Sequence, residues 1–135
     1  MNRRPRILIV EDDTPLAMMM VSLLTRAGCD VQTAWNAEKA MRLAQDEGFD
    51  LITLDVDLSG ITGFEICSRL KANPRLCDTP LIFISGRPHE EDMRRGLELG
   101  AADYITKPFD TLGLASRLLS HIKIKNNSNS VEVMA

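Results

Sequence analysis

Three short apolar runs of the chain each end at a polar or acidic side chain. The runs cover residues 7–10, 51–54 and 81–84, and they are followed in turn by Glu11-Asp12-Asp13, Asp55 and Ser85. Short apolar runs of this kind are typical of buried strands in a parallel sheet. In open α/β sheets the ligand site lies beyond the carboxyl ends of the strands, so the pattern predicts a site built from these polar groups.

Strand-like and helix-like segments alternate along the chain, which is typical of βαβ units. Further strands are expected at 31–34 and within 101–105, where Tyr104-Ile105-Thr106 leads to Lys107-Pro108. Helices are expected from Thr14-Pro15 to Gly28, from a cap at Asn36 to Gly48, over 64–72, over 89–99, and after a cap at Asp110. The apolar face of the last helix is expected to consist of Leu112, Ala115, Leu118, Leu119 and Ile122. The predicted fold class is α/β, a five-stranded doubly wound parallel sheet with five helices.

The composition is that of an ordinary globular domain. The chain has 135 residues, of which 44% are apolar and 26% charged, and its net charge of −3 gives no reason to expect binding to nucleic acid or anionic lipid. No apolar stretch is long enough to span a membrane, and the basic N-terminus lacks a signal-peptide cleavage pattern. Cys29, Cys67 and Cys77 have no metal-ligand spacing and are expected to be reduced thiols of a cytoplasmic protein. The domain is expected to cover residues 1–124, and 125–135 to form a polar tail or the start of a linker.

The acidic groups at the predicted strand ends favour a metal site. Glu11, Asp12 and Asp55 would repel one another at one edge of a sheet unless a cation offset their charge. Mg²⁺ prefers hard oxygen ligands and commonly takes one or two carboxylates with waters and a phosphate oxygen. Taken alone, residues 11–13 would more simply form a solvated turn with Asp13 or Thr14 as a helix cap. Together with Asp55 they favour a magnesium site.

Asp55, Ser85 and Lys107 suggest phosphoryl chemistry. A carboxylate at a strand end can attack a phosphoryl group and form an aspartyl phosphate, with Mg²⁺ and Lys107 offsetting the charge of the donor. Asp55 could instead cap the loop that follows it. The Ser85 hydroxyl could donate to a phosphoryl oxygen or form a simple turn into Gly86. The backbone of Lys107 is restrained by Pro108, so its ammonium could be aimed inward rather than lie in solvent.

Four segments, in their order and spacing, resemble the response-regulator receiver domain of two-component signalling. They are ILIVEDD, DLITLDVDLSGITG, PLIFISGR and GAADYITKPF, and the resemblance covers residues 5–124. It implies a flavodoxin-like fold with strand order 2-1-3-4-5. It also implies a switch rather than an enzyme, in which Asp55 accepts a phosphoryl group from a phosphohistidine of a sensor histidine kinase or phosphotransfer protein. Such a domain assists only its own phosphotransfer and autodephosphorylation, with Mg²⁺ as cofactor.

The resemblance assigns a role to each residue of the predicted site. Asp12 would bind Mg²⁺ directly, Glu11 mostly through water, and Asp57 through its backbone carbonyl, beside Asp55 itself. In the remaining roles, Ser85 would be the switch hydroxyl, Tyr104 the switch aromatic ring, Lys107 the phosphate-contacting lysine and Lys107-Pro108 a cis peptide. Without the resemblance, Tyr104 would be read as a half-buried strand aromatic.

The loop after Asp55 departs from the family's usual pattern. Ser59 and Thr62 stand where the family often has a proline and an aspartate, which removes no catalytic group. Gly60 and Gly63 are expected to permit a positive φ or a close approach of the backbone.

Asp57 and Arg87 occupy the two positions that in this family tune the lifetime of the phosphate. We hypothesise that they pair across the mouth of the site and limit the access of water. The alternative is that both side chains point into solvent. An unchanged aspartyl-phosphate lifetime in Asp57→Ala would contradict the gate.

Phosphorylation is expected to shift the surface formed by the fourth helix, fifth strand and fifth helix, through Ser85 and Tyr104. Asp103 and Arg117 fit the charge pairs through which one subfamily dimerises, but Met93 and Ala102 replace charges there, so only a weak homodimer is conceivable. The output is expected to pass to a downstream effector protein or to an output domain outside these residues, with no direct nucleic-acid or membrane contact by the domain itself.

Two other classes share parts of the pattern. A haloacid-dehalogenase-like phosphatase would use Asp55 as nucleophile and Asp57 as general acid, but in that family the nucleophile lies near the start of the chain and a further acidic pair follows the lysine. A flavodoxin-like cofactor binder would need a Gly-rich phosphate loop where this chain has Glu11-Asp12-Asp13.

Overall fold

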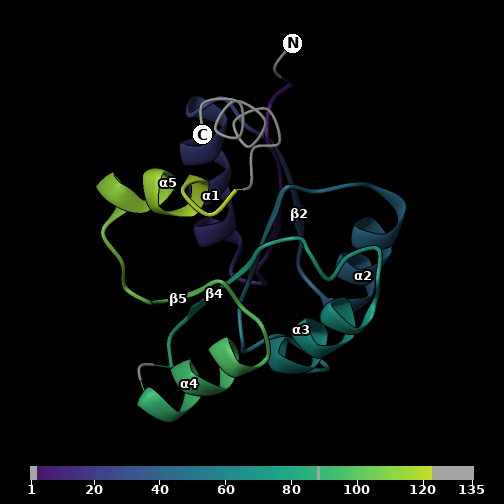
Figure 1. Ribbon diagram of the computed structural model, residues 1–135. Coiled ribbons are helices and arrows are strands. Elements are labelled where there is room, and N and C mark those ends of the chain that lie inside the picture. Colours follow the sequence, from purple (N-terminus) through teal and green to yellow (C-terminus); the bar gives the residue numbers. More distant parts are fainter. Residues whose placement is uncertain (1–2, 88, 123–135) are drawn as a thin grey trace, which may run out of the picture.

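The computed structural model describes residues 3–87 and 89–122, and within them five parallel strands form one sheet (Figure 1). The strands are β1 (Arg6–Val10), β2 (Asp30–Ala34), β3 (Leu51–Leu54), β4 (Leu81–Ser85) and β5 (Asp103–Thr106). Their order is β2-β1-β3-β4-β5, which confirms the predicted doubly wound topology. The polar tail predicted for 125–135 lies outside the described residues.

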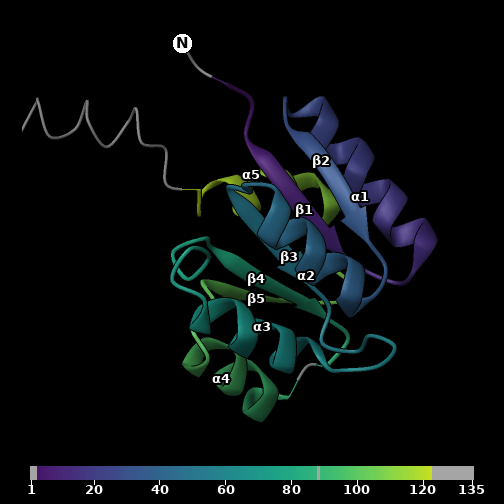
Figure 2. The ribbon, with the colours of Figure 1, turned by 90° about the vertical axis from the view of Figure 1, so that its right-hand side faces the viewer.

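In the part of the chain that the structure describes, five helices cover the two faces of the sheet. They are α1 (Thr14–Arg26), α2 (Ala37–Asp46), α3 (Gly63–Ala72), α4 (Glu90–Glu98) and α5 (Thr111–Leu119). Helices α1 and α5 lie on one face, and α2, α3 and α4 lie on the other (Figures 1 and 2). Alternate residues of a strand point to opposite faces, so Ile7 and Ile9 pack toward α1 and α5, while Leu8 and Val10 pack toward α2 and α3. None of the described helices has the length and apolar character needed to cross a membrane.

Four of the five helices begin at a side-chain cap. The capping residues are Asp13 for α1, Asn36 for α2, Thr62 for α3 and Asp110 for α5. Asp13 therefore caps the first helix, where the sequence left a choice between Asp13 and Thr14. His89 precedes α4 and makes no side-chain cap hydrogen bond.

Two sequence expectations about the helices are wrong. Helix α2 ends at Asp46 instead of continuing to Gly48. In α5 the side chain of Leu112 is 92% exposed, whereas Leu114 and Leu118 are buried against the sheet. Residues 114 and 118 lie four apart and share one helix face, while 112 lies on another side of the first turn. The three cysteines are free thiols, as predicted, and burial raises the pKa of Cys67 to about 11.

Candidate functional site

The strand register brings the predicted site residues to one edge of the sheet. Val10 pairs with Leu54 at the ends of β1 and β3, so Glu11 and Asp55 leave adjacent strands at the same level. On the other side, Lys107 follows β5, and its backbone N–H donates to the Ser85 carbonyl at 2.8 Å. Residues from four different segments therefore meet beyond the carboxyl ends of the strands.

Lys107 joins two buried carboxylates. Its Nζ lies 3.0 Å from Oε1 of Glu11 and 3.0 Å from Oδ2 of Asp55. Glu11 is 4% exposed and Asp55 is 5% exposed. Burial disfavours the charged form of Lys107, but the hydrogen bonds to Asp55 and Glu11 outweigh this and raise the pKa of its ammonium. The ammonium is thus held in place and points inward. This agrees with the first interpretation of the sequence, and not with a lysine that lies in solvent.

The acidic cluster fits a divalent cation. One carboxylate oxygen from each of Glu11, Asp12 and Asp55 lies within 4.8 Å of the other two. Burial, together with the negative charge of Asp55, raises the pKa of Glu11 to about 7. The hydrogen bonds from Lys107 and from the Asp13 N–H act in the opposite direction but are outweighed. The raised pKa shows that the ionised form of Glu11 is disfavoured here, where three carboxylates share the ammonium of Lys107. Hard oxygen donors in such a cluster are suited to Mg²⁺.

The loop after β3 lies close to Asp55, against the side chain and the backbone carbonyl of that residue. Oδ1 of Asp55 accepts a hydrogen bond from the Asp57 N–H at 3.0 Å, so Asp55 also caps this loop, as the alternative interpretation proposed. Gly60 has a φ of +96°, and a Cβ built at Gly63 would overlap the Asp55 carbonyl oxygen. The expected roles of the two glycines, positive φ and close approach, are both confirmed.

Ser85, at the end of β4, and Tyr104, on β5, both form hydrogen bonds with the backbone of Arg87. Ser85 is fully buried, and its Oγ accepts a hydrogen bond from the Arg87 N–H at 3.1 Å. The Tyr104 hydroxyl donates to the Arg87 carbonyl at 2.9 Å. The Tyr104 ring is buried against Phe83, with 5.8 Å between ring centroids, and burial raises the pKa of its hydroxyl.

Asp57 and Arg87 are in contact at the mouth of the site. Oδ1 of Asp57 accepts hydrogen bonds from Nε of Arg87 at 2.9 Å and from Nη2 at 2.6 Å. The Asp57–Arg87 ion pair hypothesised from the sequence is therefore present. Its effect on the access of water stays a prediction. The side chain of Asp57 lies outside the acidic cluster, so only its backbone carbonyl remains a candidate metal ligand. The Lys107-Pro108 peptide bond is cis.

Gly96 also contributes to this region, although no role was predicted for it from the sequence. Gly96 lies in the last turn of α4, where a Cβ would come within 2.9 Å of Phe83 Cδ2 and 3.2 Å of Tyr104 Cδ2. A glycine inside a helix costs stability relative to alanine, and this was the signal that could have indicated close packing. Gly96 leaves room for the buried Tyr104 ring.

Asp103 and Arg117 pair within one chain. Nε and Nη2 of Arg117 each donate to an Asp103 oxygen at 2.9 Å, and Nε2 of His121 lies 3.0 Å from Oδ2. Mainly because of Arg117, the pKa of Asp103 is lowered to about 2. Any dimer that used these two side chains between chains would first have to break this pair.

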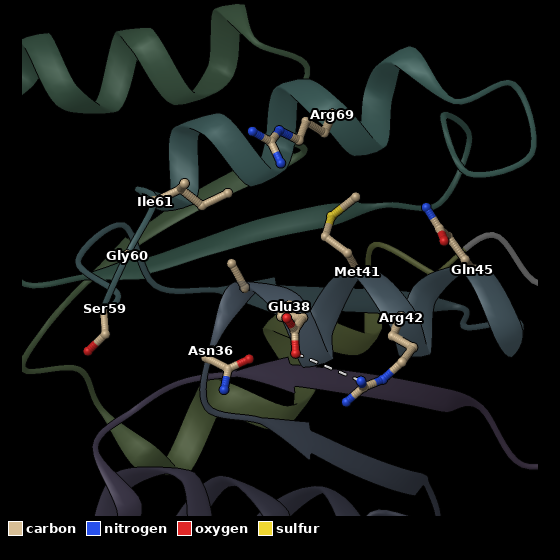
Figure 3. A pocket seen from close by; sticks show the side chains of 10 residues that line it. Asn36, Glu38, Met41, Arg42, Gln45, Ser59, Gly60, Ile61 and Arg69 are labelled. Carbon is tan, nitrogen blue, oxygen red and sulfur yellow. Dashed lines mark ion pairs between the residues drawn. The ribbon is translucent and has the colours of Figure 1, made fainter.

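A separate hollow lies between α2, α3 and the loop after β3 (Figure 3). Its volume is about 580 Å³, and apolar side chains such as Met41 and Ile61 line it together with Arg42 and Arg69. Arg42 lies 3.9 Å from Glu38 within it. None of the residues of the acidic cluster lines this hollow.

The comparisons with known proteins agree with this geometry. The family model described as "Response regulator receiver domain" matches residues 7–119. The chain belongs to this family. The two other classes considered from the sequence, a haloacid-dehalogenase-like phosphatase and a flavodoxin-like cofactor binder, are therefore not the family of this chain.

Relatives of this receiver domain include regulatory proteins and a chemotaxis protein. The nisin biosynthesis regulatory protein NisR of Lactococcus lactis is 38% identical over 96% of this chain and 56% of its own length. The phosphate regulon transcriptional regulatory protein PhoB of Pseudomonas aeruginosa is 40% identical over 83% of this chain and 49% of its own length. The structure of the chemotaxis response regulator CheY4 of Vibrio cholerae matches with a TM-score of 0.82 and 28% identity, covering 87% of this chain and 98% of that one. This chain spans about half the length of the curated relatives that it matches.

Proposed function

We propose that this receiver domain is a phosphorylation-activated switch in which Asp55 accepts a phosphoryl group from a phosphohistidine of a sensor histidine kinase or phosphotransfer protein. The observation that carries the proposal is the setting of Asp55. Its carboxylate is buried at the end of β3, paired with Lys107, and within 4.8 Å of two further carboxylates. A nucleophilic carboxylate beside a cation site and a fixed ammonium is what transfer to an acidic side chain requires.

In the transfer step, an Asp55 oxygen forms a bond to phosphorus while the P–N bond of the phosphohistidine breaks. The electron pair of that bond stays on the imidazole nitrogen, which takes up a proton. When bound by Glu11, Asp12, Asp55 and the Asp57 carbonyl, Mg²⁺ supplies positive charge against the phosphoryl oxygens.

Two residues near Asp55, Lys107 and Ser85, would contact the phosphoryl group after its transfer. The Lys107 ammonium lies 3.0 Å from Oδ2 of Asp55, so it would bind an oxygen of a phosphoryl group carried by Asp55. The Ser85 hydroxyl oxygen accepts a hydrogen bond from the Arg87 N–H, so the hydroxyl proton is free to be donated to another phosphoryl oxygen. A phosphoryl group adds roughly 1.5 to 2 negative charges at neutral pH, which makes both contacts stronger. Ser85 and Tyr104 would then change the surface of α4, β5 and α5.

The partners of this switch follow from the same proposal. It receives its phosphoryl group from a kinase or phosphotransfer protein in the cytoplasm, and it passes the signal by protein contact to an effector or to an output domain outside this sequence. The relatives with regulatory names are about twice as long as the matched region, which supports an attached output domain. The receiver itself would hydrolyse only its own aspartyl phosphate.

Phosphotransfer to Asp55→Asn tests the proposal. Wild type, Asp55→Asn and Asp110→Asn are each incubated with Mg²⁺ and a phosphohistidine donor, and incorporation is followed by intact mass. Asp110→Asn is the matched control, because asparagine caps a helix as well as aspartate and this carboxylate lies outside the acidic cluster. Wild type and the control are expected to gain one phosphoryl group and Asp55→Asn none. Normal labelling of Asp55→Asn would refute the proposal.

A further inference from the structure

Arg87 contacts three functional residues with three different chemical groups. Its backbone N–H donates to Ser85, its backbone carbonyl accepts from the Tyr104 hydroxyl, and its guanidinium donates twice to Asp57. Asp57 in turn donates its N–H to the Asp55 carboxylate. A continuous set of hydrogen bonds therefore leads from the phosphoacceptor to Tyr104 through this one arginine.

Arg87 lies two residues after the end of β4, and it is exposed. Each of the other four helices starts at a side chain that caps it, but His89 provides no such bond for α4. The two side-chain bonds of Arg87 to Asp57 tie this residue, which precedes α4, to the loop after β3.

The Tyr104 hydroxyl needs a partner at this place. The ring is 3% exposed, lies on Phe83, and faces the Cβ-free side of Gly96. A buried hydroxyl without a hydrogen bond is costly, and the Arg87 carbonyl supplies the acceptor at 2.9 Å. The inward position of the ring is therefore tied to the position of the Arg87 backbone.

We propose that Arg87 is a positioning residue whose ion pair with Asp57 holds its own carbonyl in place for the Tyr104 hydroxyl, and so keeps the Tyr104 ring inward before phosphorylation. Its significance for signalling rests on the proposed function, since only there is Tyr104 part of the switch. The ion pair then sets how far the inward state is populated in the resting protein. Phosphorylation acts on an equilibrium that Arg87 has already biased.

Fluorine NMR can test this directly because the chain has a single tyrosine. The protein is labelled with 3-fluorotyrosine and measured without Mg²⁺ or phosphoryl donor, so the result is independent of phosphorylation. The variants are Arg87→Ala, Asp57→Asn and the double variant. Arg69→Ala is the matched control, because it removes an exposed ion pair with Glu65 on α3.

Arg87→Ala and Asp57→Asn are each expected to move the resonance toward that of exposed fluorotyrosine and to increase its H₂O/D₂O isotope shift. The double variant should move it no further than the larger single change, and Arg69→Ala should leave it in place. An unmoved resonance in Asp57→Asn, or an equal movement in Arg69→Ala, would overturn the proposal. If Arg87→Ala does not fold, Asp57→Asn decides alone, since it leaves the β4–α4 segment unaltered. A chain that shows these shifts but never labels Asp55 would refute the proposed function and leave this inference standing.

Discussion

Gly96 offers a quantitative test of how tightly the Tyr104 ring is packed. Alanine in a helix interior is favoured over glycine by about 1 kcal/mol, so Gly96→Ala would stabilise an isolated α4. In the folded protein the new methyl group would lie 2.9 Å from Phe83 Cδ2 and 3.2 Å from Tyr104 Cδ2. Both rings are buried in the core and cannot retreat into solvent. Overpacking of this kind costs about 1–3 kcal/mol.

The two effects oppose each other, so Gly96→Ala is expected to change the free energy of unfolding by between about 0 and −2 kcal/mol. Gly113→Ala is the matched control, because Gly113 lies inside α5 with no heavy atom within 4 Å of its missing Cβ. It should raise the free energy of unfolding by about 0.5–1 kcal/mol. Urea unfolding at neutral pH measures both variants. A stabilisation of Gly96→Ala equal to that of Gly113→Ala would refute the close packing around Tyr104.

Three further perturbations give expected outcomes. Gly63→Ala would place a methyl group in steric overlap with the Asp55 carbonyl oxygen, and should lower the free energy of unfolding by at least about 2 kcal/mol in urea titrations and slow phosphorylation. Lys107→Met removes the ammonium that competes with a cation for the carboxylates, and should tighten Mg²⁺ binding by roughly tenfold in calorimetric titrations while weakening the response to phosphorylation. Asp103, with its pKa lowered to about 2 from 3.8 mainly by Arg117, should stabilise the fold at neutral pH. This contribution, about 1–2 kcal/mol because Arg117 is half exposed, should disappear as the pH falls from about 4 to 2.

Each of these predictions has a control and a contradicting result. Gly48→Ala, at a glycine with open space around it, should leave stability nearly unchanged. An equal loss of stability in Gly48→Ala would show that the loss in Gly63→Ala does not come from the close approach to Asp55. Weaker Mg²⁺ binding by Lys107→Met would contradict the assignment of the acidic cluster as the cation site. For Asp103→Asn, the loss of stability should be largest at pH 7 and vanish near pH 2. A loss that stayed constant down to pH 2 would show that the charge of Asp103 is not its cause.

The sheet and the strand-end site could be predicted because both follow from local patterns. Apolar runs of four residues that end at Glu11, Asp55 and Ser85 specify buried parallel strands, and parallel strands bring their carboxyl ends to one edge. The order of the strands came from the family resemblance, since the pairing partners lie far apart in the chain.

What the sequence missed depends on contacts between distant segments. Leu112 has the right spacing for an apolar face but lies in the first turn of α5, where it is exposed. The close approach of Gly96 to Tyr104 joins α4 to β5, and the hydrogen bond from the Tyr104 hydroxyl to the Arg87 carbonyl joins β5 to the segment after β4. No periodicity within one segment encodes such contacts.

The most direct test of the central claim is to locate the phosphoryl bond itself. An aspartyl phosphate is reduced by borohydride to homoserine, whereas a free carboxylate and a phosphoserine are not. After phosphotransfer in the presence of Mg²⁺, borohydride treatment and peptide mass spectrometry should find homoserine at position 55 and at no other aspartate. Homoserine at Asp12 or Asp57, or stable label on Ser85, would contradict the account.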